Sequence, residues 1–381
     1  MHALVVFHDL LTDPVISSFV EMLEAEEGRA FVEACARFET LLFSNGDNWS
    51  TYLSHAVIHS ENIAVRLKAV NKLNSTVEAA LNTELSVLTE ASAVQLSMFP
   101  FAETKLFTPW NTSETDFRSV YAERLEEVSR KGYGIYADYH VFTANDGELV
   151  PVKYPDPQRL SELPGYEDER QKVIANVEAL LTGQPAVNML LYGDAGTGKS
   201  STIKAIANEY KDRGLRLIEV RRNDLYHIPA LLEQLASLPL HFIIFIDDLS
   251  FSSNDDNFSA LKAILEGSVS RQAGNTIIAA TSNRRHLVRE SVSDRFQDDL
   301  HERDTRQELL SLSARFGLIV TFQKPDRSRY LYIVKELARE YGIETEEGTL
   351  IAKAEAFALR AGGRTPRVAR QFIEQIKSGV L

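Results

Sequence analysis

A glycine-rich segment of eight residues carries the clearest chemistry in this sequence. The pattern G-x-x-x-x-G-K-S/T is matched at every position by Gly193-Asp194-Ala195-Gly196-Thr197-Gly198-Lys199-Ser200. Glycines allow the backbone to curl so that successive N–H groups point at phosphate oxygens. In such a loop the lysine reaches the β- and γ-phosphates and the final hydroxyl binds Mg²⁺. The segment, with Ser201 after it, therefore predicts a site for a nucleoside triphosphate and Mg²⁺.

Two aspartates follow an apolar run, Phe242–Ile246, which has the composition of a buried strand. Asp247 belongs at the strand tip, facing the Mg²⁺ that Ser200 would bind. Asp248 is placed to orient or deprotonate an attacking water molecule. A strand that ends in aspartate is often only a turn signal, but behind a complete glycine loop the pair predicts metal and water ligands. Asp248 is one methylene shorter than the glutamate that is usual at such nucleotide-hydrolysing sites, which shortens its reach to the water molecule.

The elements that must position these residues alternate between short apolar strands and helices. This alternation indicates a parallel sheet covered by helices. After Pro325 the pattern is helical only, with breaks at Gly342 and Gly362-Gly363, and predicts a small lid. The strands are expected at Val187–Tyr192, Leu215–Val220, Phe242–Ile246, Thr276–Ala280 and Leu318–Phe322.

The first third of the chain has a different, helical pattern. Asp13-Pro14 supplies a cap and a first-turn proline, and apolar residues from Val70 to Leu88 recur at spacings of three and four. Asn145-Asp146-Gly147 has the composition of a hairpin turn, and closely spaced prolines follow it. The predicted domains are a helical region 1–130, a hairpin and linker 131–164, an α/β core 165–324 and a helical lid 325–381.

Composition narrows the class of protein. The 381 residues are 44% hydrophobic and 25% charged, as in ordinary soluble proteins. The formal charge of −13 argues against unspecific binding of nucleic acid by the whole surface. We expect no membrane span and no signal peptide. The single cysteine, Cys35, excludes an internal disulfide and favours the cytoplasm, with the thiol buried in a helix.

From about Leu163 to its end the sequence resembles the AAA+ ATPases, a class of P-loop NTPases. Ala280-Thr281-Ser282-Asn283 is similar to the strand end that this family calls sensor 1, which implies that Asn283 contacts the γ-phosphate. Thr365-Pro366-Arg367 is similar to sensor 2, which implies that Arg367 reports the state of that phosphate to the lid. The family holds adenine between linker and lid, near Tyr166, although ordinary domain packing explains this residue equally well.

The resemblance also implies an arginine that completes the ATP site of a neighbouring subunit. Ser313-Ala314-Arg315-Phe316-Gly317 is similar to the segment that carries it, and Arg295 is the rival. Such an arginine contributes roughly 10³–10⁵ in rate by neutralising charge in the transition state. We favour Arg315 because it directly precedes the apolar strand Leu318–Phe322. For either arginine, an exposed salt bridge is the alternative.

Three segments resemble an uncharacterised bacterial family of AAA+-like ATP-binding proteins, a domain of unknown function: Asp247–Phe251, Ala280–His286 and Leu312–Leu318. The expected function is therefore an ATP hydrolase, with ATP and Mg²⁺ as cofactors, that remodels or assembles an unknown protein client as a homo-oligomer with shared sites. The alternatives are a slow nucleotide-dependent switch, which the shorter Asp248 favours, and a DNA loader or initiator. The negative charge and the lack of a DNA-binding motif count against nucleic acid as the partner.

Overall fold

The computed structural model describes residues 1, 3–249, 261–262, 264–265, 274–283 and 315–381. The chain forms two compact units, Met1–Asp138 and Tyr139–Leu381. No described helix is both long enough and apolar enough to cross a membrane.

The first unit is helical, and its core is rich in aromatic side chains. Trp49 is fully buried, stacks on Phe19 with ring centroids 4.2 Å apart, and donates its indole N–H to the carbonyl of Ala91. Asp13 caps the first α-helix, as its position before Pro14 predicted. The helices are α1 Pro14–Glu24, α2 Arg29–Phe43, α3 Trp49–His59, α4 Ile63–Ala69, α5 Ser75–Ser92, α6 Phe117–Lys131 and α7 Ile135–Asp138, with the short 3₁₀ helices His8–Thr12, Leu96–Met98 and Ala102–Leu106.

The apolar stripe expected from Val70 to Leu88 is divided between two elements. Asn74 accepts a hydrogen bond from the backbone N–H of Val77 and so caps α5, which leaves Val70 outside that helix. Within α5, Leu81, Leu85 and Leu88 are buried, as expected for a core face. The periodicity predicted the face correctly but missed the cap, because an asparagine can start a new helix within an apolar pattern.

Among the described residues, the second unit contains a seven-stranded sheet with the order β2-β1-β4-β5-β6-β3-β7. All neighbouring strands run parallel except the β1–β2 hairpin, so the predicted parallel α/β fold is confirmed. Nearly all residues of β4, β5 and β6 are buried, and most of them are apolar, as expected for strands covered on both faces. The strands are β1 Val141–Asn145, β2 Glu148–Pro151, β3 Met189–Gly193, β4 Leu215–Val220, β5 His241–Ile246, β6 Thr276–Ser282 and β7 Leu318–Phe322.

The hairpin has a closer connection to the sheet than its sequence suggested. The turn at Asp146 and Gly147 is present, but β1 also pairs in parallel with β4 and so extends the core sheet. Its first strand begins only at Val141, because Ile135–Asp138 form α7. Short buried strands of this kind are hard to separate from helices by periodicity alone.

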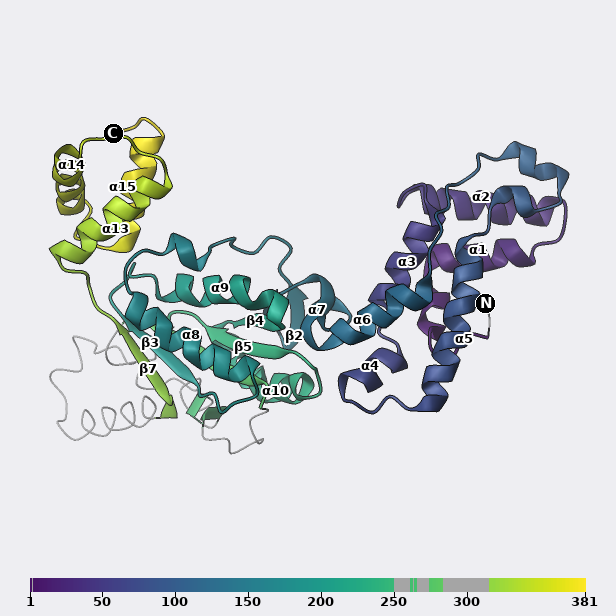
Figure 1. Ribbon diagram of the computed structural model, residues 1–381, viewed down its shortest axis with the longest axis horizontal. Helices are drawn as coiled ribbons and strands as arrows, with labels where there is room; N and C mark the ends of the chain where they lie inside the picture. Colours follow the sequence, from purple (N-terminus) through teal and green to yellow (C-terminus); the bar gives the residue numbers. More distant parts are fainter. Residues whose placement is uncertain (2, 250–260, 263, 266–273, 284–314) are drawn as a thin grey trace. The chain divides into compact units, whose positions relative to one another are not determined.

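Helices surround the sheet and then form the C-terminal lid. Figure 1 shows the chain passing from β7 into α13, α14 and α15. Tyr330 and Ile333 of α13, Ala354 of α14 and Phe372 of α15 are buried in the same apolar cluster as the sheet. The helices are α8 Glu167–Leu181, α9 Lys199–Tyr210, α10 Ile228–Ala236, α13 Arg327–Glu340, α14 Glu347–Arg360 and α15 Pro366–Lys377, with the 3₁₀ helices Leu160–Glu162, Lys211–Arg213 and η6 Arg222–His227.

Candidate active site

The glycine loop connects β3 to α9 at the carboxyl edge of the sheet. Gly193, Gly196 and Gly198 all have positive φ angles, of 140°, 75° and 95°. At Gly193 a side chain is excluded, because a Cβ atom would lie 2.0 Å from the carbonyl oxygen of Phe322. The backbone N–H of Asp194 donates to that same oxygen at 3.2 Å, which holds the loop against β7.

The Lys199 side chain lies inside the loop. It is 6% exposed, and its Nζ donates to the carbonyls of Gly193 at 2.9 Å and Asp194 at 2.8 Å. Nζ also donates to Oδ1 of Asn283 at 3.0 Å, which brings the end of β6 to the loop. Burial lowers the pKa of Lys199, and the negative charge of Asp194 opposes this shift.

Asp247 is the centre of a hydrogen-bond network at the ends of β5 and β6. Its Oδ1 accepts hydrogen bonds from Ser200 Oγ at 2.6 Å, from Thr281 Oγ1 at 2.6 Å and from the backbone N–H of Asp248 at 3.1 Å. Carboxylate and hydroxyl oxygens are the ligands that Mg²⁺ prefers. Asp247 and Ser200 therefore form a donor set of the right chemistry, side by side as the sequence predicted.

Asp248 has a left-handed backbone, with a φ angle of 50°. Aspartate tolerates this conformation better than most residues. Its N–H donates to Thr281 Oγ1 at 2.9 Å, and its Oδ1 accepts from Asn283 Nδ2 at 2.6 Å. The structure thus connects Asp248, Asn283 and Lys199 through one asparagine side chain.

Thr281 is a part of this network for which the sequence predicted no role. It is 1% exposed and contacts both aspartates through its hydroxyl. A signal was present in the sequence: Thr281 lies two residues before Asn283, and side chains two apart in an extended segment point to the same face.

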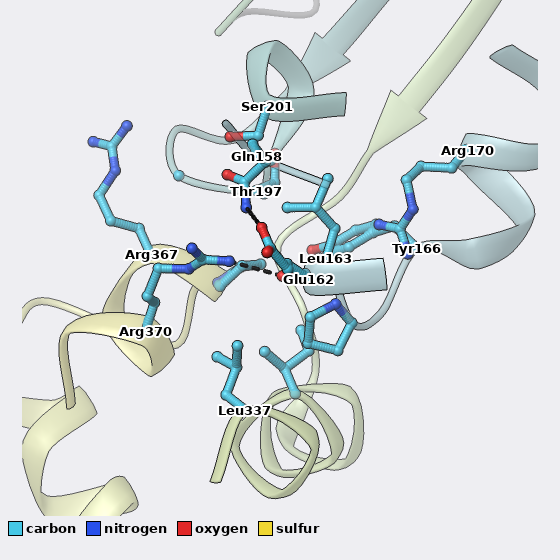
Figure 2. A pocket seen from close by; sticks show the side chains of 15 residues that line it. Gln158, Glu162, Leu163, Tyr166, Arg170, Thr197, Ser201, Leu337, Arg367 and Arg370 are labelled. Atoms are coloured by element: carbon cyan, nitrogen blue, oxygen red, sulfur yellow. Dashed lines mark hydrogen bonds between the residues drawn. The ribbon is translucent and has the colours of Figure 1, made fainter. Parts of the chain in front are cut away.

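A cavity of about 210 Å³ lies beside the loop, between the linker and the lid. Thr197 and Ser201 line it from the loop side, and Leu337, Arg367 and Arg370 line it from the lid (Figure 2). Enclosing a drug-sized ligand takes roughly 300–1,000 Å³, so this cavity matches only part of a nucleotide.

Two hydrogen bonds from α15 to backbone carbonyls hold the lid at this cavity. The N–H of Arg367 donates to the carbonyl of Gly196 at 3.2 Å. The guanidinium of Arg370 donates to the carbonyl of Glu162 at 2.7 Å, which Figure 2 shows as a dashed line. The sequence around Arg370 is compatible with a solvated basic residue, but in the structure this side chain bridges the lid and the linker.

Tyr166 lines the cavity, but the residue is only 1% exposed. It stacks on Phe322 with centroids 5.4 Å apart, and the guanidinium of Arg329 lies 4.8 Å from its centroid. Its hydroxyl donates to the carbonyl of Gln323 at 2.5 Å. Packing between the core and the lid therefore occupies much of this side chain, the second of the two roles that its sequence context allowed.

The favoured trans-acting arginine, Arg315, does not lie in this site. Arg315 precedes β7 at its Leu318 end, whereas the loop follows β3 at the Gly193 end, which pairs with Phe322. Because the strands are parallel, Arg315 lies at the opposite edge of the sheet, about 17 Å away along a five-residue strand. Arg295 lies outside the described residues.

Comparison with known proteins identifies the family. Residues 136–380, more than half of the chain, match the family described as "Protein of unknown function (DUF815)". The chain belongs to this family. The expectation from the sequence, a family of unknown function within the AAA+ superfamily, is confirmed.

Curated relatives of this DUF815 protein lie in two groups. The chain is 32% identical over 122 residues to the replication factor C large subunit of Staphylothermus marinus, covering 30% of this chain and 28% of the relative. It is 26% identical over 227 residues to the Holliday junction branch migration complex subunit RuvB of Solibacter usitatus, covering 58% and 60%. The chain therefore spans less than two thirds of the length of these relatives.

Solved structures that are similar to the DUF815 chain include Thermotoga maritima RuvB, with 20% identity, a TM-score of 0.39 and coverage of 58% of this chain and 65% of that one. AMPPCP-bound DnaA from Aquifex aeolicus has 23% identity and a TM-score of 0.42, with coverage of 60% and 68%. TM-scores this low carry no weight for function, so the function has to be inferred from the residues of this chain.

Proposed function

We propose that this protein binds ATP with Mg²⁺ at the carboxyl edge of its sheet and hydrolyses the γ-phosphate. The observation that carries this proposal is the hydrogen-bonded set of Lys199, Ser200, Asp247, Asp248 and Asn283, which comes from three separate elements. A glycine turn without a ligand requires none of these contacts. Their joint placement is what phosphoryl transfer needs, because its catalysis is mostly positioning and charge stabilisation.

Each side chain of the set has a distinct role in this proposal. The N–H groups of the loop and the ammonium of Lys199 bind the phosphate oxygens, and the start of α9 adds its positive dipole. Ser200 and Asp247 hold Mg²⁺, which neutralises phosphate charge when it is bound. Asp248 accepts a proton from, or orients, the attacking water, and Asn283 fixes the direction of the Asp248 carboxylate.

The cavity between linker and lid is the proposed place for the base. Its Thr197 and Ser201 side adjoins the phosphate loop, and Leu163, Pro164, Ile333 and Leu337 give it apolar lining. Because α15 contacts the loop at Gly196 and the linker at Glu162, a nucleotide bound in this cavity would lie in direct contact with the lid. We infer that hydrolysis shifts the lid and thereby alters contacts with a protein client, in a homo-oligomer whose sites are shared.

Nucleotide binding is tested with a fluorescent ATP analogue. Lys199→Ala should weaken binding at least tenfold, since hydrogen bonds to charged groups are worth about 1.5–3 kcal/mol. Lys204→Ala, on the same helix but outside the loop, is the matched control and should bind as the wild type does. Equal affinities for the wild type and Lys199→Ala would refute the phosphate site.

The shared site is tested by mixing two inactive variants. A Lys199→Ala subunit still has Arg315, and an Arg315→Ala subunit still has an intact phosphate loop. In a mixed oligomer, some sites therefore combine the intact loop of one subunit with the intact arginine of its neighbour. Recovery of ATPase activity on mixing supports Arg315 as the arginine supplied by the neighbour. No recovery, together with light scattering that shows only monomers in ATP, refutes a shared site.

A slow nucleotide switch is the second candidate, and the Asp248–Asn283 hydrogen bond favours it. This contact engages Oδ1 of the carboxylate that should act on water, and the side chain is already short. Steady turnover well above about one per minute that Asp248→Asn abolishes would exclude the switch, since unassisted GTPase switches turn over near or below this rate.

A DNA-associated ATPase is the third candidate, and the curated relatives favour it. One is named as a Holliday junction branch migration subunit and another as a replication factor. The net charge of −13 opposes it. A gel shift with duplex and single-stranded DNA across a range of salt concentrations decides, because binding through phosphates must weaken as salt rises.

A further inference from the structure

Three potential metal ligands lie together outside the nucleotide site. They are Asp146, Asp224 and His227, and one ligand atom of each lies within 4.8 Å of those of the other two. Asp146 is exposed, His227 is half-buried and Asp224 is buried. The proposed function uses none of the three.

The topology of the sheet brings these residues together. β1 and β4 are parallel neighbours, and Ala144 near the end of β1 pairs with Val220 at the end of β4. The chain leaves β1 through the hairpin turn that contains Asp146, and it leaves β4 into η6, which contains the other two ligands. The turn packs closely on η6, since a Cβ atom on Gly147 would lie 3.3 Å from Nδ1 of His227.

The Asp224 carboxylate gives independent evidence for a ligand. The residue is only 8% exposed, yet its side chain has no hydrogen bond or ion pair with any residue that the structure describes. The carboxylate of a residue buried to this degree is normally paired or bound to metal, because an unpaired charge loses part of its hydration there.

Another buried carboxylate of the same chain shows the usual arrangement. Glu84 is 6% exposed, and its two oxygens accept hydrogen bonds from the backbone N–H groups of Val5, Val6 and Phe7. Asp224 instead lies beside an imidazole nitrogen and a second carboxylate oxygen, with one ligand atom of each residue within 4.8 Å of the others. A cation bound by all three would balance its charge.

We propose that Asp146, Asp224 and His227 bind a divalent transition-metal ion of the Zn²⁺ type. An imidazole beside two carboxylates suits such ions, whereas Mg²⁺ and Ca²⁺ prefer oxygen ligands alone. Ligand atoms around a tetrahedral Zn²⁺ are about 3.3 Å apart, given bond lengths of about 2.0–2.2 Å. The three ligand atoms already lie within 4.8 Å of one another, and water completes the coordination at the exposed side.

The ion would join the hairpin turn to η6 and balance the charge of Asp224. Tyr226, between the two ligands of η6, is 60% exposed, and its ring centroid lies 4.0 Å from that of His227. A bound ion therefore fixes a surface that presents an aromatic side chain. Because the ion binds only the folded arrangement, it should also raise the free energy of unfolding.

The test is calorimetric titration of Zn²⁺ into the metal-free, full-length protein, with excess Mg²⁺ present to occupy oxygen-only sites such as Ser200 and Asp247. One equivalent should bind. Asp146→Asn and His227→Ala should each weaken binding by more than about 100-fold, since outer-shell partners alone contribute 10–100-fold. Glu148→Gln removes an exposed carboxylate from the start of β2 in the same hairpin and should leave binding unchanged.

Asp146→Asn makes the test robust, because asparagine tolerates the left-handed backbone of this exposed turn and the variant should fold normally. Circular dichroism and the melting temperature without metal verify this. Wild-type protein that binds no Zn²⁺ at micromolar concentration refutes the site. A Zn²⁺ affinity that is the same in Asp146→Asn and in the wild type also refutes it.

Discussion

Thr281→Val tests whether the threonine hydroxyl positions both aspartates of the site. Valine keeps the shape of threonine but can neither donate to Asp247 nor accept from the backbone N–H of Asp248, as Thr281 does at 2.6 Å and 2.9 Å. A hydrogen bond to a charged group is worth about 1.5–3 kcal/mol. That free energy corresponds to a roughly ten- to hundredfold change in an equilibrium or rate constant.

We therefore expect Thr281→Val to lower kcat/KM for ATP by roughly ten- to hundredfold and to raise the Mg²⁺ concentration needed for half-maximal activity. Both are measured by phosphate release over a Mg²⁺ series. Thr281→Ser retains the hydroxyl and should keep most of the activity, and urea unfolding of each variant separates loss of function from loss of stability. A folded Thr281→Val variant with wild-type Mg²⁺ dependence would show that this hydroxyl positions nothing.

Two further predictions concern stability. Gly193→Ala should lower the free energy of unfolding, measured by urea denaturation, by about 3 kcal/mol or more, because φ is 140° and the new Cβ would meet the Phe322 carbonyl at 2.0 Å. The control Gly348→Ala should change it little, because the nearest atom there is 3.7 Å away. Equal losses of stability in the two variants would contradict a steric cause. Burial raises the pKa of Glu39 from 4.5 to about 7, so the stability from its bound proton is complete below about pH 4.5 and is lost as the pH rises through about 7. Glu39→Gln should flatten this fall in the free energy of unfolding, measured at about pH 5 and pH 8, and an unchanged fall would contradict burial as its cause.

The sequence predicted the sheet and its carboxyl edge because the relevant signals are local. The carboxyl ends of parallel strands meet at a common edge of the sheet. A glycine loop that follows one buried strand and aspartates that follow another must therefore lie at the same edge. Lys199, Asp247 and Asn283 could therefore be expected to lie together. The roles assigned to them remain predictions, which the nucleotide-binding and phosphate-release measurements address.

Other features of the second unit depend on contacts between distant segments, which periodicity does not encode. The pairing of β1 with β4 brings the hairpin into the sheet, and it also places Asp146 beside η6. Likewise, the bridge from Arg370 to the carbonyl of Glu162 spans 208 positions of sequence and leaves no local pattern. An isolated arginine on a lid helix is more often solvated, so sequence alone gave no reason to assign this contact.

The most direct test of the central proposal is Mg²⁺-dependent phosphate release from ATP by the purified full-length protein. The wild type should release phosphate steadily only when Mg²⁺ is present. Lys199→Ala and Asp247→Asn should each reduce the rate at least tenfold, while Lys204→Ala should not change it. A wild-type rate no higher than that of Lys199→Ala, in protein shown to be folded, would contradict hydrolysis at this site.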